Sequence, residues 1–216
     1  MNNKKIAQTT IIITIIILLS KLSGFLREIA LAYAFGTSVE SDAFVLAQSA
    51  VGIFSSLLLV SLGIAFIPVY SKLKLNGEET ELKTFVDSIY TVVGVSIVAV
   101  AAVGFFGADI LVYVLAPGFS VEGHAIASTL TKMILPTIVL TFVVTIQGQQ
   151  LRANHVFFPS ACIAIPSNIA LILAFVFLTS LTGIYGAAYA YILGCALQIA
   201  LLYPFVSKIG YQYHYR

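Results

Sequence analysis

Charged residues are scarce in this sequence. Asp, Glu, Lys and Arg make up 9% of the 216 residues, against ~25% in ordinary soluble domains. Hydrophobic residues make up 60%, and the mean hydropathy is +1.03. This composition excludes an ordinary soluble domain and indicates an integral membrane protein. The net charge of +2 is small and the basic residues are scattered, so we expect no nucleic-acid partner.

Cysteine and the common catalytic motifs are also scarce. Cys162 and Cys195 both lie in apolar runs, so we expect small packing residues rather than a disulfide. The three histidines, His124, His155 and His214, are far apart and have no Cys or carboxylate at metal-ligand spacing. No Walker loop, no Gly-x-Ser-x-Gly and no His-Glu-x-x-His occurs. The sequence therefore predicts no metal, no cofactor and no enzyme of these common classes.

Long apolar segments are what the chain does contain. At a helical rise of ~1.5 Å per residue, the stretch from Ile6 to Phe35 would span ~45 Å, more than a ~30 Å hydrocarbon core. Five further segments are similarly apolar, and we predict an all-α integral membrane protein with six transmembrane helices. The predicted spans are 6–35, 43–70, 85–114, 125–150, 156–179 and 184–206.

The first segment has an alternative interpretation. Lys4 and Lys5, followed by an apolar stretch and then Ala30-Leu31-Ala32, could be a cleaved signal peptide. Three charges before that site fit a signal peptide poorly, and five more apolar segments follow. These features favour a membrane helix.

The stretches between and within the segments give further structural expectations. Residues 72–83 carry six charges in twelve residues and are predicted to be a solvated linker, and residues 116–118 (Ala-Pro-Gly) predict a turn. Pro159 and Pro166 predict a bend in the fifth segment. Asn168 in the same segment is expected to be a hydrogen-bond partner between helices.

Basic residues gather on one side of the predicted topology. The N-terminus, the 72–83 linker, the loop at 152–155 and the C-terminal tail carry most of the Lys and Arg residues. The loops after the first, third and fifth segments carry none. The residues are Lys4, Lys5, Lys72, Lys74, Lys83, Arg152, Lys208 and Arg216. The positive-inside rule therefore predicts that both termini are cytoplasmic.

The remaining basic residues, Lys21, Arg27 and Lys132, fall inside predicted helices. On a helical wheel Lys21 and Glu28 lie about 20° apart with Gly24 between them, and Arg27 lies about 100° from Glu28. A charge that faces lipid costs at least ~2.5 kcal/mol at the bilayer centre, so these side chains should face a protein interior or a watery cavity. Gly24 would allow close helix approach or a bend. Charges in such places are candidates for function.

Each candidate also has a structural alternative. Lys21 could pair with Glu28 at i, i+7, and Arg27 could form a salt bridge that fixes a helix bend. Lys132, roughly 13 Å along its helix, could extend to the outer interface. Asp42 could cap the second segment, because a carboxylate is stabilising at a helix N-terminus.

Several of these residues fall into a pattern typical of one family. The run Ser20-Lys21-Leu22-Ser23-Gly24-Phe25-Leu26-Arg27-Glu28, then Phe35-Gly36 and Ser41-Asp42-Ala43-Phe44, resembles the first-helix signature of MurJ-type lipid II flippases. These belong to the MOP superfamily, which also holds O-antigen flippases and MATE exporters. The resemblance extends over essentially the whole chain, through Ala65-Phe66-Ile67-Pro68, Ala116-Pro117-Gly118-Phe119, Lys132 with Pro136, the 166–169 run and Lys208-Ile209-Gly210.

The resemblance implies a V-shaped alternating-access transporter whose N-terminal lobe has six helices and a cationic cavity for the diphosphate of a lipid-linked sugar. Residues 1–216 would form this N-terminal lobe in the bacterial cytoplasmic membrane. Lys21 and Arg27 would be cavity cations, Glu28 an acidic partner near Arg27, Asp42 the acidic position after the first helix, and Lys132 a further substrate contact. The implied partners are the lipid-linked diphosphate sugar, membrane lipids and a second lobe.

The chain departs from the family pattern in three ways. Members of the best-known type have Arg at the position of Lys21, Asp at the position of Glu28, and an arginine pair where Phe54 and Ser55 stand here. Arg binds phosphate bidentately whereas Lys acts as a point charge, so affinity or sugar selectivity is expected to differ. No second lobe follows in this sequence, so we expect half of a transporter that pairs with a second copy or with a separate C-terminal lobe.

Other functions stay open at this point. A flippase for O-antigen or another polysaccharide unit would share the same chemistry. A MATE-like antiporter would need a carboxylate-dominated cavity, whereas three cations to one carboxylate favour an anionic cargo. A truncated, non-transporting membrane partner protein is a further alternative, and an integral-membrane transferase is less favoured because no acidic pair or metal motif is present.

Overall fold

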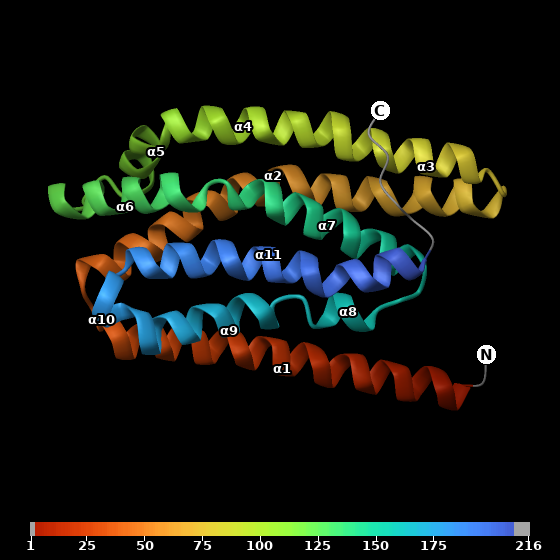
Figure 1. Ribbon diagram of the computed structural model, residues 1–216, viewed down its shortest axis with the longest axis horizontal. Helices are drawn as coiled ribbons and strands as arrows, with labels where there is room; N and C mark the ends of the chain where they lie inside the picture. Colours follow the sequence, from red (N-terminus) through yellow and green to blue (C-terminus); the bar gives the residue numbers. More distant parts are fainter. Residues whose placement is uncertain (1–2, 210–216) are drawn as a thin grey trace.

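The computed structural model describes residues 3–209, and over that range it consists of helices without a strand (Figure 1). The prediction of an all-α fold is therefore confirmed. Gly210, His214 and Arg216, which were used in the sequence predictions, lie outside the described residues, as do the side chains of Lys4 and Lys5.

Within residues 3–209, five helical stretches are long and apolar enough to cross a membrane, and a bent pair of helices gives a sixth if the pair forms one span. The bounds of the helices in the first three stretches are α1 (Asn3–Phe35), α2 (Val39–Leu75), and α3 (Glu79–Ser88) continued through the π-helical η1 (Ile89–Val93) into α4 (Gly94–Phe106). The short α5 (Ala108–Leu115) follows. The bent pair is α6 (Val121–Ile134) with α7 (Thr137–Ala153), which meet at 44°. The next stretch consists of four short elements, α8 (Phe158–Ala161), α9 (Ile165–Leu173), η2 (Ala174–Leu178) and α10 (Thr179–Thr182). The last stretch is the single helix α11 (Tyr185–Lys208).

Prolines and a glycine determine where the helices break. Pro136 lies at the bend between α6 and α7, where its missing N–H interrupts the helical hydrogen bonds. Pro159 and Pro166 lie in the first turns of α8 and α9, so the predicted bend of the fifth segment is a break between two helices. The third segment was predicted to continue to residue 114, but α4 ends at Phe106 and α5 begins after Gly107. The turn predicted at residues 116–118 is present, closed by a 3.1 Å hydrogen bond from Phe119 N–H to the Ala116 carbonyl.

The charged stretch at 72–83 is not the open linker that the sequence predicted. Helix α2 continues to Leu75 and α3 begins at Glu79, so only residues 76–78 form the connection. Gly77 provides the tight turn with φ of +74°. Lysines in the last turn of α2 and glutamates in the first turn of α3 match the helix dipoles, and so the charges support helix in place of loop.

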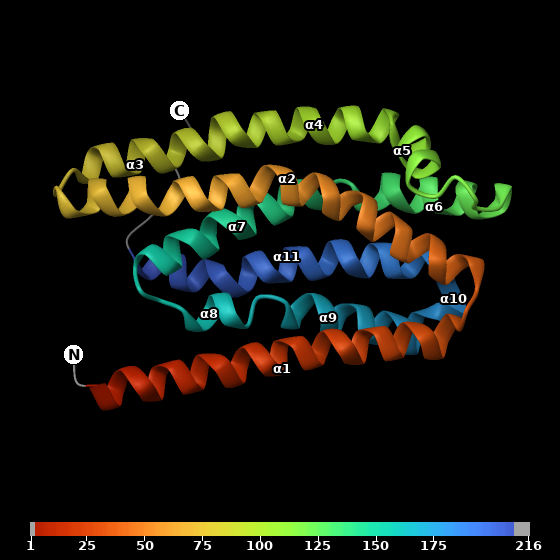
Figure 2. The same cartoon turned by 180° about the vertical axis from the view of Figure 1, so that it is seen from behind.

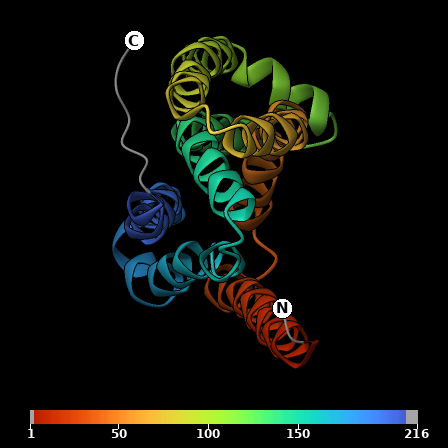
Figure 3. The same ribbon diagram turned by 90° about the vertical axis from the view of Figure 1, so that its right-hand side faces the viewer.

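Helices α2, α6, α7, α9 and α11 pack together, and α1 lies along one edge of this group (Figures 1 and 3). Helix α1 packs mainly on α9 and diverges from α2 beyond their connecting turn (Figure 2). Because lipid provides no hydrophobic drive between helices, association depends on close contact. At the α9–α11 crossing, a Cβ on Gly194 would lie 2.6 Å from the Ser167 Cα, so only glycine fits there.

Candidate functional site

The predicted charges of α1 do not all lie on its packed side. The buried or half-buried face contains Ser20, Ser23, Gly24 and Arg27, spaced as one side of a helix. Lys21 and Glu28 are exposed, on the side that also exposes Leu18, Leu22 and Phe25.

Arg27 forms an ion pair with Glu28, in which Arg27 Nη2 donates to Glu28 Oε1. The Arg27 side chain is 26% exposed and that of Glu28 is 52% exposed. Over the described part of the chain, Lys21 has no ion pair within 4.0 Å. The alternative pairing of Lys21 with Glu28 is therefore wrong, because Glu28 reaches its sequence neighbour instead. Lys21 is left as an exposed cation.

A polar contact fixes this part of α1 on α9. Asn168 Nδ2 donates to Ser23 Oγ at 2.8 Å, and Ser23 Oγ donates to the Ser20 carbonyl at 2.7 Å. A Cβ on Gly24 would lie 3.6 Å from Asn168 Nδ2, so Gly24 lies in direct contact with α9 while α1 stays unbroken. Asn168 is thus the hydrogen-bond partner between helices that the sequence predicted. It holds the charged turn of α1 in place.

Asp42 lies exposed in the first turn of α2, but it is not the cap. Ser38 is the N-cap: its hydroxyl accepts a 3.2 Å hydrogen bond from Ser41 N–H, and its carbonyl accepts one of 3.2 Å from Asp42 N–H. The capping alternative for Asp42 is therefore corrected, although Glu40 and Asp42 still complement the helix dipole. Asp42 makes no ion pair with another described residue.

Lys132 is paired with a residue that was not predicted to be its partner. Lys132 Nζ donates to both carboxylate oxygens of Asp109, at 3.0 and 2.9 Å. Hydrogen bonds from Lys132 and then from Ser128 hold the pKa of the Asp109 carboxyl, which lies on α5 outside the crossing segments, below its usual range. Helix α5 lies at the opposite edge of the molecule from α1 (Figure 1). The structure therefore does not bring Lys132 together with the charges of α1.

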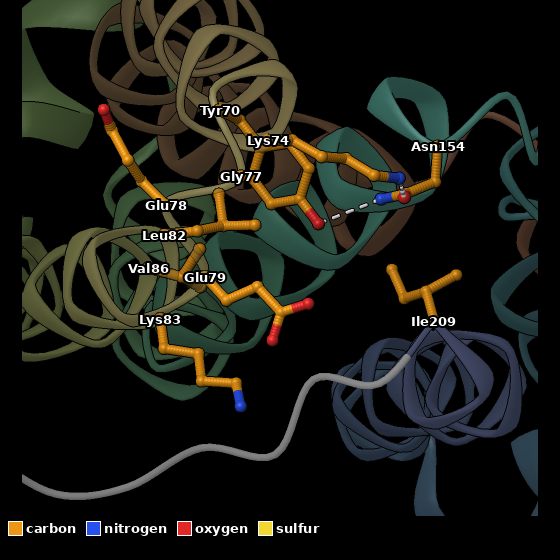
Figure 4. A pocket seen from close by; sticks show the side chains of 10 residues that line it. All are labelled: Tyr70, Lys74, Gly77, Glu78, Glu79, Leu82, Lys83, Val86, Asn154 and Ile209. Atoms are coloured by element: carbon orange, nitrogen blue, oxygen red, sulfur yellow. Dashed lines mark hydrogen bonds between the residues drawn. The ribbon is translucent and has the colours of Figure 1, made fainter.

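The end of the molecule that holds the α2–α3 turn has a polar pocket of about 370 Å³ (Figure 4). Asn154 connects α7 to α2 there: its Nδ2 donates to Tyr70 Oη at 2.9 Å, and its Oδ1 accepts from Lys74 Nζ. Glu79 and Lys83 of α3 also line this pocket. The sequence showed a run of charges here but not that Asn154, at the end of α7, lies against α2 in the same pocket.

A second hollow, of about 490 Å³, lies between α2 and α7. Its walls are apolar on the α2 side, and the α7 side contributes Thr145, Gln149 and Arg152. We call this the α2–α7 groove; its lining residues are Leu59, Val60, Gly63, Ile64, Ile67, Thr145, Gln149 and Arg152. The sequence analysis placed Arg152 in a loop, whereas α7 continues through Ala153. The signal that could have revealed the groove is the i, i+4, i+7 spacing of these three polar residues on one helix face.

Comparison with known proteins identifies a consistent set of relatives. The family model described as lipid II flippase MurJ matches residues 31–216. A lipid II flippase MurJ of Burkholderia cenocepacia is 31% identical over 205 residues, which cover 89% of this chain and 38% of the relative. A probable lipid II flippase MurJ of Buchnera aphidicola subsp. Baizongia pistaciae is 28% identical, over 95% of this chain and 41% of the relative.

The fold also matches a solved structure. That structure, a lipid II flippase MurJ in an inward closed conformation, superposes with a TM-score of 0.78 at 24% identity. The match covers 95% of this chain and 43% of the other. This chain therefore spans less than half the length of the relatives that it matches.

Proposed function

The chain belongs to the lipid II flippase MurJ family, and from this membership we propose that it is the N-terminal half of a transporter for a lipid-linked diphosphate sugar. The cargo is an undecaprenyl-diphosphate-linked sugar, namely the peptidoglycan precursor lipid II. Its headgroup moves from one side of the cytoplasmic membrane to the other, with no bond made or broken. The chain is accordingly a transporter lobe and not an enzyme.

The exposed charged side of α1 carries this proposal. Lys21 and Glu28 are exposed next to Leu22 and Phe25, and α1 diverges from α2 (Figure 2). If that side faced lipid, each charge would cost at least ~2.5 kcal/mol at the bilayer centre. A second half packed across the open side of α1 and α2 would enclose the charges in a central cavity, as in transporters built from two repeats.

Within that cavity we assign different roles to the charges. Lys21, which has no acidic partner among the described residues, provides a free positive charge for the diphosphate. Arg27 is held by Glu28, and its five N–H donors allow it to bind a phosphate oxygen while it keeps that pair. Asp42 contributes an acidic group at the turn between α1 and α2. Lys132 is neutralised by Asp109 and acts in the structure of the lobe rather than in the cavity.

The orientation that fits the basic residues places both termini in the cytoplasm. The α2–α3 turn, Asn154 and the pocket beside them then lie at the cytoplasmic surface, and Gly36 and residues 116–120 lie on the outer side. Membrane lipids surround the remaining faces of the helices.

Substitution of the cations tests the assignment. In the transporter assembled from both halves, Lys21→Ala and Arg27→Ala should abolish flipping of a fluorescent lipid-linked diphosphate sugar, measured by access of an impermeant quencher in liposomes. Membrane insertion should be unchanged, because neither charge is needed to hold α1 in lipid. Lys132→Ala is the matched control and should flip at more than half the rate of the unchanged protein. Full flipping by Lys21→Ala would show that this cation does not bind the cargo.

A further inference from the structure

We propose that the α2–α7 groove is a second binding site for the cargo, in which Arg152 and Gln149 bind a phosphate of the lipid-linked diphosphate before it reaches the charges of α1. The inference rests on the proposed function and adds a site that lies on other helices. On α2 the groove runs along the middle of the helix, and on α7 it ends at Arg152, two residues before Asn154, which contacts Tyr70 and Lys74. In the proposed orientation the headgroup would enter at this end, from the cytoplasm.

The first feature of the groove is the Gln149 side chain, a buried amide on its α7 side. This side chain is only 8% exposed, and its Oε1 is buried without a hydrogen-bond partner over residues 3–209. A buried amide oxygen without a partner costs ~1–3 kcal/mol, so the packing of α7 on α2 keeps a polar group here at a cost in stability. The NH₂ group of the same amide is not among the buried, unpaired atoms, and Gln149 lines the groove, so this group can donate to a phosphate oxygen there.

Gly63 is the residue that makes room for this amide. A Cβ at position 63 would overlap Gln149 Nε2, so glycine allows the amide to lie against α2 at the floor of the groove. Gly52 on the same helix differs, because a Cβ at that position would meet nothing within 4 Å. An alanine at 63 would therefore push the end of the Gln149 side chain out of its present position, whereas an alanine at 52 would displace nothing.

Arg152 supplies the positive charge. Unlike Arg27 and Lys132, it has no carboxylate partner among the residues that the structure describes. Its guanidinium extends back along α7, because a Cβ on Gly148 would lie 3.7 Å from Arg152 Nη2. The group therefore lies one turn back along α7, beside Gly148, at the exposed end of the groove that Gln149 also lines. There it can form the two parallel hydrogen bonds that arginine makes to phosphate.

The remaining walls fit the rest of such a cargo. Leu59, Val60, Ile64 and Ile67 give α2 a continuous apolar wall beside the polar side chains of α7. A ligand with an anionic headgroup and an apolar chain could place its headgroup against the polar α7 side and its chain against the apolar α2 wall. A free diphosphate would use only the α7 side and should bind much more weakly.

Equilibrium binding to the 216-residue chain in detergent tests the site. Undecaprenyl diphosphate is the probe, and inorganic diphosphate and phosphatidylglycerol are compared with it. Arg152→Gln should weaken binding of undecaprenyl diphosphate about tenfold, since it removes a charge-assisted pair, and Arg152→Lys should weaken it about threefold. Gly63→Ala should also weaken it, because the new Cβ displaces the Gln149 amide.

Matched controls separate these effects from changes in the fold. Gly52→Ala makes the same change on the same helix in open space, and Lys208→Gln removes a cation near the same end outside the groove; both should bind within twofold of the unchanged chain. Unchanged binding by Arg152→Gln and Gly63→Ala, with loss in Lys21→Ala, would overturn this inference and leave the proposed function intact. Equal affinity for phosphatidylglycerol would reassign the groove to membrane phospholipid. No binding of undecaprenyl diphosphate by the unchanged chain would overturn the groove site, whereas the proposed function is tested separately by flipping in the transporter assembled from both halves.

Discussion

His155 adopts a backbone conformation that histidine rarely takes. Its φ of +61° places it in the left-handed region, directly after the C-cap Asn154 of α7. His155 N–H donates to the Arg152 carbonyl at 3.0 Å, and Val156 N–H donates to the Leu151 carbonyl at 2.8 Å. These two bonds form a Schellman motif, in which the left-handed position usually belongs to glycine.

We therefore expect His155→Gly to raise the free energy of unfolding by about 1 kcal/mol, because the left-handed conformation costs a non-glycine residue ~1–2 kcal/mol. Thermal unfolding in detergent measures it. His155→Ala is the control: it keeps the strain and loses the ring contact with Phe157, so it should give no gain. A destabilised glycine variant would mean that the ring contact outweighs the backbone strain.

At the scale of single residues, the sequence located the charges within the apolar α1 helix but not their partners. Lys21, Arg27 and Glu28 stand out because charge in an apolar helix is expensive. Which of them pair depends on side-chain rotamers, and these brought Arg27 and not Lys21 to Glu28. Asp109 and Arg152 were not predicted as site residues because each lies near a helix end, where a charge needs no special explanation.

Among the helices that the structure describes, the crossing of α9 and α11 brings the backbone of a neighbouring helix closest to a glycine. A Cβ on Gly194 would lie 2.6 Å from the Cα and 2.8 Å from the Cβ of Ser167. The clash is with backbone, which cannot rotate away. Near this crossing, Gln198 Nε2 donates to Ser167 Oγ at 2.8 Å, so the same residue is both packed and hydrogen-bonded.

Gly194→Ala should therefore destabilise the lobe by about 1–3 kcal/mol, the usual cost of overpacking. Gly52→Ala makes the same substitution where space is open and should be neutral or slightly stabilising, because alanine favours helix. Unfolding in a mixed detergent series compares the two. If both variants unfold together, the α9–α11 contact is looser than the structure indicates.

At the scale of the helices, hydropathy predicted the segments but not their geometry. Long apolar runs are sufficient to identify helices that cross a membrane. The 44° bend between α6 and α7 and the short turn at 76–78 depend on one proline and one glycine in particular contexts. The divergence of α1 from α2 depends on pairwise contacts with α9, which periodicity does not reveal.

For the whole molecule, the orientation in the membrane is the first prediction. In a background without Cys162 and Cys195, a cysteine at Asn76 should be labelled by an impermeant maleimide only after cells are opened. A cysteine at Gly118 should be labelled in intact cells. The reason is the gathering of Lys and Arg at the end that holds residue 76. The reverse pattern would invert the topology and place the α2–α7 groove on the outer side.

We propose that this lobe works only when a second lobe covers the charged side of α1. The most direct measurement is flipping of a fluorescent lipid-linked diphosphate sugar in liposomes that contain the 216-residue chain alone, with its oligomeric state determined in the same vesicles. A full-length relative serves as the positive control. We expect no flipping by the monomer, because Lys21 and Glu28 lie on an open side and cannot alternate between two closed states. Flipping by the monomer at the rate of the full-length relative would contradict the account.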